Sequence, residues 1–119
     1  MKKILLVDDD MDLLFMLKQA LKSHGYSVTA LADGSAVLNT IEFVRPDMIV
    51  LDIHMPPWDG RVICSSIKNI AAYQNIPVVL YSALQEDKDV VTMCKADLFL
   101  QKPLSTIEFV NEIKAAMPG

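Results

Sequence analysis

The sequence predicts an α/β domain in which a parallel β-sheet is covered by helices on both faces. Five short apolar segments alternate with longer segments whose apolar residues recur at helical spacing. Three of the apolar segments are rich in Val and Ile, as buried strands are. A chain of alternating strands and helices forms a parallel sheet through right-handed crossovers. The predicted strands are residues 3–7, 27–31, 47–51, 77–81 and 97–101.

Three segments between the strands have the spacing of amphipathic helices. The first, residues 10–25, ends at Gly25, a residue that commonly terminates helices. The second, residues 33–45, ends before Pro46, and the third covers residues 59–70. The predicted buried faces are Leu13, Leu14, Leu17 and Leu21 in the first helix, Val37, Ile41 and Val44 in the second, and Ile63, Ile67 and Ile70 in the third.

The last two helices differ in the strength of their signals. The closing helix is predicted to begin near Ser105, because Glu108 three residues later completes a capping box. In the preceding helix, residues 86–96, few apolar residues are available as anchors. The predicted apolar positions are Val90, Val91 and Cys94 in this weak helix, and Ile107, Val110, Ile113 and Met117 in the closing one.

Composition limits the class of protein. The 119 residues indicate a single domain, predicted to span residues 1–119, and a hydrophobic fraction of 52% excludes disorder. A net charge of -4 and a pI near 5.0 argue against a nucleic-acid binder, which needs a basic face. Cys64 and Cys94 match no metal-binding spacing and are expected to be reduced thiols. No apolar run reaches the ~18 residues of a membrane span, so a cytoplasmic protein is expected.

Polar residues stand at the ends of four predicted strands. Asp8 and Asp9 follow the first strand, Asp52 ends the third, and Ser82 and Lys102 follow the fourth and fifth. In an open parallel sheet, ligands bind beyond the carboxyl ends of the strands, where the strand order reverses. Each residue taken singly has a structural explanation. A strand-end Asp is often a helix N-cap, which we expect of Asp10 or Asp59, and a lone lysine is often a solvated charge. The occurrence of all these residues at the carboxyl ends of the predicted strands favours a functional site.

The chemistry that fits this set is phosphoryl transfer to a carboxylate. Asp52 is expected to be the nucleophile. Asp8 and Asp9 are expected to hold Mg²⁺, which prefers oxygen ligands and also offsets the repulsion between adjacent carboxylates. The ammonium group of Lys102 is expected to lie beside the phosphoryl oxygens as a positive point charge, and Ser82 is expected to donate a hydrogen bond to one of these oxygens. The sequence contains no glycine-rich phosphate loop, so a nucleotide is not the expected donor.

At this point the chain resembles the receiver domain of two-component response regulators, particularly the single-domain chemotaxis regulators. The resemblance covers essentially the whole length and depends on "VDDD" at 7–10, Asp52 with "MPPWDG" after it, "SA" at 82–83 and "KP" at 102–103. It implies a flavodoxin-like (βα)₅ three-layer sandwich whose five-stranded parallel sheet has the order 2-1-3-4-5.

The resemblance also implies roles for individual residues. Asp52 corresponds to the phosphoacceptor. Asp9 and Asp52 correspond to direct Mg²⁺ ligands together with the backbone carbonyl of His54, while Asp8 acts mostly through water. Ser82 and Lys102 correspond to the residues that contact the phosphoryl group, and Ser82 moves when the domain switches. Phe99 falls at the position of the switch aromatic.

The implied function is a two-component phosphorelay switch and not a true enzyme, although such a domain assists its own phosphorylation and dephosphorylation. The phosphoryl donor would be a sensor histidine kinase or a histidine phosphotransfer protein. The output would be a downstream protein target or a detached effector domain, with no nucleic acid or membrane bound by this domain and a weak homodimer as a further expectation. No effector domain follows in the chain, so we expect either a stand-alone receiver or one excised from a longer protein.

Two other functions remain open at this point. One is a pseudo-receiver, a constitutive interaction module of the same fold that is never phosphorylated. The other is a phosphatase that works through an aspartyl phosphate, although His54 stands where its second acid would be expected.

Lys95 stands where the family usually has a glycine, which predicts a short or frayed fourth helix. Trp58, in the loop after Asp52, is expected to respond to Mg²⁺ in its fluorescence.

Overall fold

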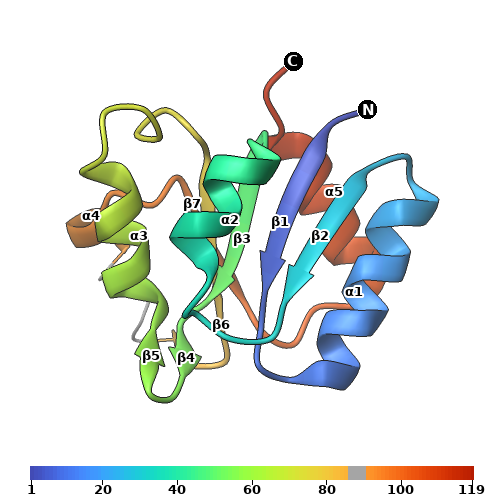
Figure 1. Cartoon of the computed structure of the whole chain (residues 1–119). Coiled ribbons are helices and arrows are strands. Elements are labelled where there is room, and N and C mark those ends of the chain that lie inside the picture. Colours follow the sequence, from blue (N-terminus) through green and yellow to red (C-terminus); the bar gives the residue numbers. More distant parts are fainter. Residues whose placement is uncertain (86–90) are drawn as a thin grey trace.

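The chain forms a five-stranded parallel sheet, seen in a computed structural model that describes residues 1–85 and 91–119. The strands lie in the order β2-β1-β3-β6-β7, which is 2-1-3-4-5 when these five are counted along the chain (Figure 1). The predicted fold class is therefore confirmed, including the strand order that the resemblance implies. The strands are β1 (Lys3–Val7), β2 (Ser27–Leu31), β3 (Met48–Asp52), β6 (Val78–Ser82) and β7 (Leu98–Gln101).

Two strands lie one residue later than predicted, and this shift matters for the site. Asp52 and Ser82 are the last residues of β3 and β6, where Asp52 pairs with Tyr81 and Ser82 pairs with Gln101. Pro77 has no N–H to donate and lies before β6, although its carbonyl oxygen accepts a hydrogen bond from Ile49 N. Asp52 and Ser82 are thus held by the sheet itself.

The helices form two layers (Figure 1). α1 (Met11–Ser23) and α5 (Thr106–Ala116) cover one face of the sheet, and α2 (Val37–Val44), α3 (Gly60–Lys68) and α4 (Val91–Cys94) lie on the other. Successive side chains of a strand point to opposite faces of the sheet, so alternate strand residues lie in two separate apolar cores. Ile4, Leu6, Val50 and Tyr81 face α1 and α5, whereas Leu5, Val7, Leu51 and Leu80 face α2, α3 and α4.

The predicted helix caps are confirmed. Asp10 caps α1 by accepting a hydrogen bond from Leu13 N, and Asp59 caps α3 by accepting one from Arg61 N. Ser105 and Glu108 form the predicted capping box at the start of α5. These caps fix where each helix begins relative to the strand before it.

The predicted apolar positions of α1 and α2 are buried, apart from Leu13 and Val44, which are half-buried. Cys64 and Ile67 are buried in α3, and Ile63 is only half-buried. In α5 the prediction was wrong for Ile107, which is 56% exposed, while Phe109 is fully buried. The capping box places Ile107 in the first turn, whereas the ring of Phe109 packs against Tyr81 with centroids 5.4 Å apart.

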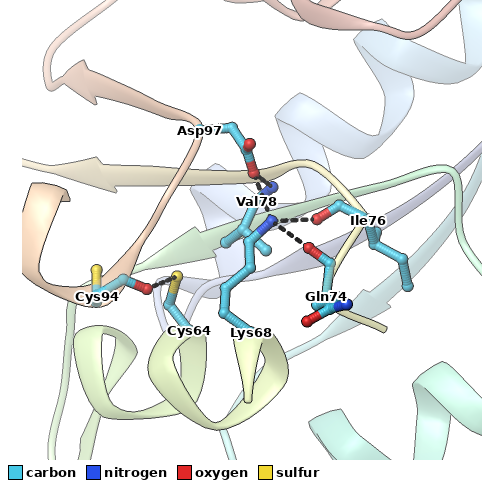
Figure 2. A network of polar contacts seen from close by, with 7 residues as sticks. All are labelled: Cys64, Lys68, Gln74, Ile76, Val78, Cys94 and Asp97. Carbon is cyan, nitrogen blue, oxygen red and sulfur yellow. Dashed lines mark hydrogen bonds and ion pairs between the residues drawn. The ribbon is translucent and has the colours of Figure 1, made fainter. Parts of the chain in front are cut away.

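A polar network joins α3 to β6 and β7 (Figure 2). The buried Lys68 Nζ donates to Asp97 Oδ2 at 2.7 Å and to the carbonyl oxygens of Ile76 at 2.7 Å and Gln74 at 3.2 Å. Asp97 Oδ2 also accepts a hydrogen bond from Val78 N at 2.8 Å. One lysine therefore ties the end of α3 to the connection before β6 and to the residue before β7.

Both cysteines lie beside this network, in the α3–α4 interface. Cys64 and Cys94 are buried free thiols, as predicted, and Cys64 Sγ donates to the carbonyl oxygen of Cys94 at 3.4 Å (Figure 2). Burial, followed by the neighbouring Cys94 thiol, raises the pKa of Cys64 to about 12. Cys64 is therefore an unreactive thiol at neutral pH.

The structure describes α4 over Val91–Cys94, while Val90 and the rest of 86–90, on which the prediction for the fourth helix also falls, lie outside the described residues. The short or frayed helix therefore stays a prediction. Lys95, directly after α4, has a φ of 64° and so takes the left-handed conformation expected of the family's glycine. Among the helices in the described ranges, none is long and apolar enough to cross a bilayer.

Candidate functional site

Three carboxylates converge at the carboxyl end of the sheet, the lower edge in Figure 1. β1 and β3 are paired neighbours, which brings Asp8 and Asp9 beside Asp52. One carboxylate oxygen from each of the three residues lies within 4.8 Å of those from the other two. Asp8 and Asp52 are buried and Asp9 is exposed. The predicted acidic cluster is thus assembled by strand pairing.

Lys102 supplies a positive charge to this cluster. Its Nζ lies 3.0 Å from Asp8 Oδ2 and 3.4 Å from Asp52 Oδ1, and 5.0 Å from the centroid of the Tyr81 ring. Its backbone N donates to Ser82 O at 2.7 Å, which extends the β6–β7 pairing by one residue. Lys102 therefore reaches from the last strand of the sheet to the ends of β1 and β3.

The surroundings of the cluster shift the pKa values of Asp52 and Lys102. Burial first, and then the charge of Asp8, raises the pKa of Asp52 to about 6, although Lys102 acts in the opposite direction. Burial lowers the pKa of Lys102, but its hydrogen bond with Asp8 and the charge of Asp52 outweigh this, so the pKa of Lys102 is raised. The positive charge of Lys102 is thus too small to neutralise the three carboxylates Asp8, Asp9 and Asp52.

Local hydrogen bonds fix the turn that carries Asp8 and Asp9. Asp10 N donates to Asp8 Oδ1 at 2.9 Å, while the side chain of Asp10 caps α1. Asp8 N donates to Leu31 O at 3.1 Å, which continues the β1–β2 pairing. Asp8 therefore accepts one backbone N–H and one ammonium N–H, while Asp9 remains exposed.

Ser82 and Phe99 lie on the two strands beyond β3. Ser82 is fully buried, and its Oγ accepts a hydrogen bond from Leu84 N at 3.1 Å. Phe99 pairs with Leu80 across the β6–β7 ladder and is half-buried in the core that faces α2, α3 and α4. Ser82 is one residue beyond Tyr81, the partner of Asp52, so it belongs to the same sheet edge as the carboxylates.

The segment after Asp52 folds back as a hairpin of β4 (His54–Met55) and β5 (Trp58–Asp59). Gly60 N donates to Ile53 O at 2.8 Å, and a Cβ added at Gly60 would lie 2.1 Å from the carbonyl oxygen of Asp52. Only glycine permits this approach. Gly60 was not singled out from the sequence, although "DG" after a proline pair is a signal for a tight backbone approach.

The donor set of this edge fits a hard divalent cation. Carboxylate oxygens are preferred Mg²⁺ ligands, and one from each of Asp8, Asp9 and Asp52 lies within 4.8 Å of the other two, with the ammonium group of Lys102 beside Asp8 and Asp52. Burial and then the charge of Asp8 raise the pKa of Asp52, and a bound cation would favour the ionised carboxylate and relieve the repulsion from Asp8. His54 lies two residues after Asp52, at the start of β4, with an exposed side chain.

A doubly wound parallel sheet with a carboxylate cluster and a lysine at its carboxyl edge defines the protein as an α/β domain with an acidic site suited to a divalent cation. Residues 4–114 match the model of the response regulator receiver domain, and the chain belongs to this family. The resemblance drawn from the motifs at the strand ends is thereby confirmed.

Relatives and solved structures agree with this assignment. The chain is 36% identical over 117 residues to the transcriptional regulatory protein PrrA of Mycobacterium leprae, covering 97% of this chain and 49% of that protein. It is 33% identical over 113 residues to protein RcaC of Microchaete diplosiphon, covering 93% of this chain and 17% of that protein. The chain thus spans about half or less of the length of these relatives. A structure of the Vibrio cholerae chemotaxis protein CheY4 superposes with a TM-score of 0.91 at 25% identity, covering 98% of this chain and 99% of that one.

Proposed function

We propose that this receiver domain accepts a phosphoryl group on Asp52 in a Mg²⁺-dependent reaction and uses it to switch protein–protein interactions. The observation that carries the proposal is the convergence of Asp8, Asp9 and Asp52 around Lys102 at one sheet edge. Membership of the receiver family supports it. The donor would be a sensor histidine kinase or a histidine phosphotransfer protein.

The proposed step forms a bond between an Asp52 carboxylate oxygen and phosphorus, while the bond from phosphorus to the donor's imidazole nitrogen breaks. Asp52 must be ionised to attack. Its pKa of about 6 leaves it mostly ionised at neutral pH. The sheet holds it in place, because β3 pairs with β1 on one side and β6 on the other. With acetyl phosphate as donor, the broken bond is the one from phosphorus to the acetyl oxygen.

Asp9, Asp52 and the backbone carbonyl of His54 would hold the Mg²⁺ ion, with Asp8 acting mostly through water. When bound, Mg²⁺ neutralises charge on the phosphoryl oxygens. Asp8 has a second task, since it holds Lys102 at 3.0 Å and so keeps the ammonium group within reach of the transferred phosphoryl group. Lys102 then stabilises negative charge that Asp52 gains when it becomes an acyl phosphate.

The output is proposed to pass through Ser82 and Phe99. Ser82 Oγ accepts a hydrogen bond from Leu84 N, and its O–H would be donated to a phosphoryl oxygen on Asp52, which would draw Ser82 and the residues after it toward the site. A shift of the segment after β6 would open space for Phe99, which is only half-buried. The change would favour one of two states of the surface around α4 and β7.

The partners proposed for that surface are a downstream protein or a detached effector domain, with a weak homodimer as a further possibility to be measured. The names of the matched relatives include transcriptional and DNA-binding regulators. We propose no nucleic-acid contact for this domain itself, since the chain carries a net charge of -4. A cytoplasmic location is part of the same proposal.

The decisive experiment is incubation with acetyl phosphate and Mg²⁺ followed by mass spectrometry of the intact protein. We expect a mass increase of one phosphoryl group that disappears in Asp52→Asn and in the absence of Mg²⁺. Asp12→Asn is the matched control, because Asp12 is an exposed aspartate of α1, and it should be modified normally. Absence of an adduct with both acetyl phosphate and a cognate kinase would favour a pseudo-receiver. Steady turnover of many phosphate esters would favour a phosphatase.

A further inference from the structure

Tyr81 is a buried residue of β6 that lies directly before Ser82 and is 2% exposed. Its backbone pairs with Asp52 of β3 on one side and with Leu100 of β7 on the other. Its carbonyl oxygen also accepts a hydrogen bond from Ile53 N at 3.3 Å. Because successive side chains of a strand point to opposite faces of the sheet, the ring of Tyr81 leaves β6 on the face away from Ser82, toward α1 and α5.

The ring of Tyr81 is in contact with the ammonium group of Lys102. Lys102 Nζ lies over the ring, 5.0 Å from its centroid. An ammonium group within ~6 Å of the centroid is attracted by the negative face of the ring, and the attraction is stronger where water is excluded. The Lys102 side chain is only 18% exposed. The ring is therefore a further contact of the ammonium group, beside Asp8 at 3.0 Å and Asp52 at 3.4 Å.

Contacts outside β6 fix the position of this ring. The ring of Phe109 in α5 is fully buried and lies against it, with centroids 5.4 Å apart and planes inclined by 34°. Burial raises the pKa of Tyr81, whereas the charge of Lys102 and a hydrogen bond from the backbone N–H of Leu104 act in the opposite direction. The phenol is therefore neutral at neutral pH, and its hydroxyl is bound to the segment that carries Lys102.

The ring differs from the other contacts of Lys102 because it has no other task at the site. Asp8 and Asp52 are also proposed to act at the metal or at phosphorus, whereas Mg²⁺ prefers oxygen ligands to a ring face. The hold of the ring on the ammonium group therefore does not depend on what the carboxylates bind. A lysine side chain has many rotamers, and fixing them before the reaction removes an entropic cost from the transition state.

We propose that Tyr81 is a positioning residue for phosphoryl transfer to Asp52, an inference that rests on the proposed function. Its ring holds the ammonium group of Lys102 beside Asp8 and Asp52, within reach of the transferred phosphoryl group. Tyr81 acts through Lys102 and takes no part in the bond changes at phosphorus.

The initial rate of Asp52 phosphorylation by acetyl phosphate at saturating Mg²⁺, followed by the mass of the intact protein, tests this role. Tyr81→Leu keeps an apolar side chain but removes the ring face, and should slow the reaction about three- to tenfold. Tyr81→Phe keeps the ring and should retain most of the rate. Tyr73→Leu is the matched control, because Tyr73 is a half-buried tyrosine at the other core, and it should react normally. A Tyr81→Phe variant as slow as Tyr81→Leu, or an equal loss in Tyr73→Leu, would overturn the proposal.

A double-mutant cycle separates positioning of Lys102 from a general loss of packing. Lys102→Met alone should react more slowly than the wild type, and acetyl phosphate is raised until this variant gives a measurable rate. If Tyr81 acts through Lys102, adding Tyr81→Leu to Lys102→Met should cause no further loss. A merely structural effect would slow the reaction by the same factor in both backgrounds and would overturn the proposal.

The contact between the ring and Lys102 can be measured without a phosphoryl donor. Protons that lie over the face of an aromatic ring are shifted upfield in NMR spectra, so the Cε protons of Lys102 should lie upfield of those of the exposed Lys114. The shift should persist in Tyr81→Phe and disappear in Tyr81→Leu. Lys102 signals at the position of the Lys114 signals in the wild type would overturn the proposal. A wild type that shows the shift but accepts no phosphoryl group from acetyl phosphate or a cognate kinase would contradict the proposed function and leave the contact standing.

Discussion

Lys102 Nζ lies 3.0 Å from Asp8 Oδ2, although 94 residues separate the two in the chain. The pair joins the segment after the last strand to the segment after the first, across the position of Asp52. The side chain of Asp8 is only 3% exposed, and its contacts with Lys102 and with Asp10 N take the place of water around the carboxylate. The lysine thus stabilises the acidic edge in addition to its proposed role in phosphoryl transfer.

Replacing Lys102 by methionine should lower the free energy of unfolding by about 1–3 kcal/mol, because a buried carboxylate loses its charged partner. Added Mg²⁺ should stabilise this variant more than the wild type, since the carboxylates no longer share a competing ammonium group. Urea unfolding with and without Mg²⁺ measures both effects. Lys114→Met, at an exposed position of α5, is the control and should change little. A variant as stable as the wild type without Mg²⁺ would contradict the structural role.

Asp52→Asn should stabilise the protein at pH 7 when divalent cations are absent. The pKa of Asp52 is raised from 3.8 to about 6, so the folded state binds this proton more tightly than the unfolded state does. The charged form therefore destabilises the fold above pH 6, and the penalty fades as the pH falls toward 3.8. We expect a gain of about 1–2 kcal/mol at pH 7 that is largely lost near pH 4.

Urea unfolding at the two pH values, in the presence of a chelator, tests the Asp52→Asn prediction. Asp12→Asn should show no such pH-dependent gain, because Asp12 is exposed. Mg²⁺ should reduce the difference between wild type and Asp52→Asn, since the ion offsets the same repulsion. A destabilised Asp52→Asn at pH 7 would mean that Lys102 outweighs burial and Asp8.

Much of the fold and of the site could be predicted because the signals are local. Each strand is a short apolar run, and each polar site residue follows its strand directly, so parallel pairing alone brings Asp8, Asp9 and Asp52 together. The caps at Asp10 and Ser105 were predictable for the same reason, since a cap bonds to residues two or three positions away. The metal and phosphoryl roles remain proposals.

Other features depend on contacts that spacing does not encode. Ile107 and Phe109 are both apolar, and only the place where α5 crosses the sheet decides that Phe109 is buried. Lys68 looks like a solvated lysine in the sequence, yet its side chain is 7% exposed because its partners come from two later segments, the connection before β6 and the residue before β7. Cys64 and Cys94 were predicted correctly as thiols, but their contact across α3 and α4 could not be foreseen.

Lys68→Met should destabilise the protein by about 2–4 kcal/mol. The substitution leaves the carbonyl oxygens of Gln74 and Ile76 without their buried donor and separates α3 from β7. Asp97→Asn should cost less, because the Asp97 side chain is 50% exposed and an asparagine can still accept from Val78 N. Thermal and urea unfolding measure the two losses. Lys22→Met, at an exposed position of α1, is the control, and a loss in Lys68→Met no larger than in Lys22→Met would contradict the prediction.

The fluorescence of Trp58 should change when Mg²⁺ binds. Trp58 is 41% exposed and lies in the hairpin that begins with His54, whose carbonyl oxygen is the proposed metal ligand. A titration with Mg²⁺ should give a saturable change in emission, and Asp9→Asn should need a much higher concentration of the ion. Emission that stays constant up to saturating Mg²⁺, with binding shown independently, would argue against His54 O as a ligand.

Lys95→Gly should stabilise the protein by about 1 kcal/mol. Lys95 has a φ of 64°, in the left-handed region where a residue with a Cβ is strained and glycine is not. The strain relieved in the folded state, roughly 1–2 kcal/mol, is partly offset by the greater freedom of glycine in the unfolded chain. Lys95→Ala serves as the comparison, since it removes the side chain and keeps the Cβ.

Gly25 provides the reverse test of the same argument, because its φ is 92° and no atom lies within 4 Å of a Cβ placed there. Gly25→Ala should therefore destabilise the protein through backbone strain alone. Urea unfolding of the three variants should rank Lys95→Gly above the wild type and Gly25→Ala below it, with Lys95→Ala close to the wild type. If Lys95→Gly were less stable than Lys95→Ala, the residue after α4 would not be held in the left-handed conformation in solution. The segment that leads into β7 and Phe99 would then differ from the one described here.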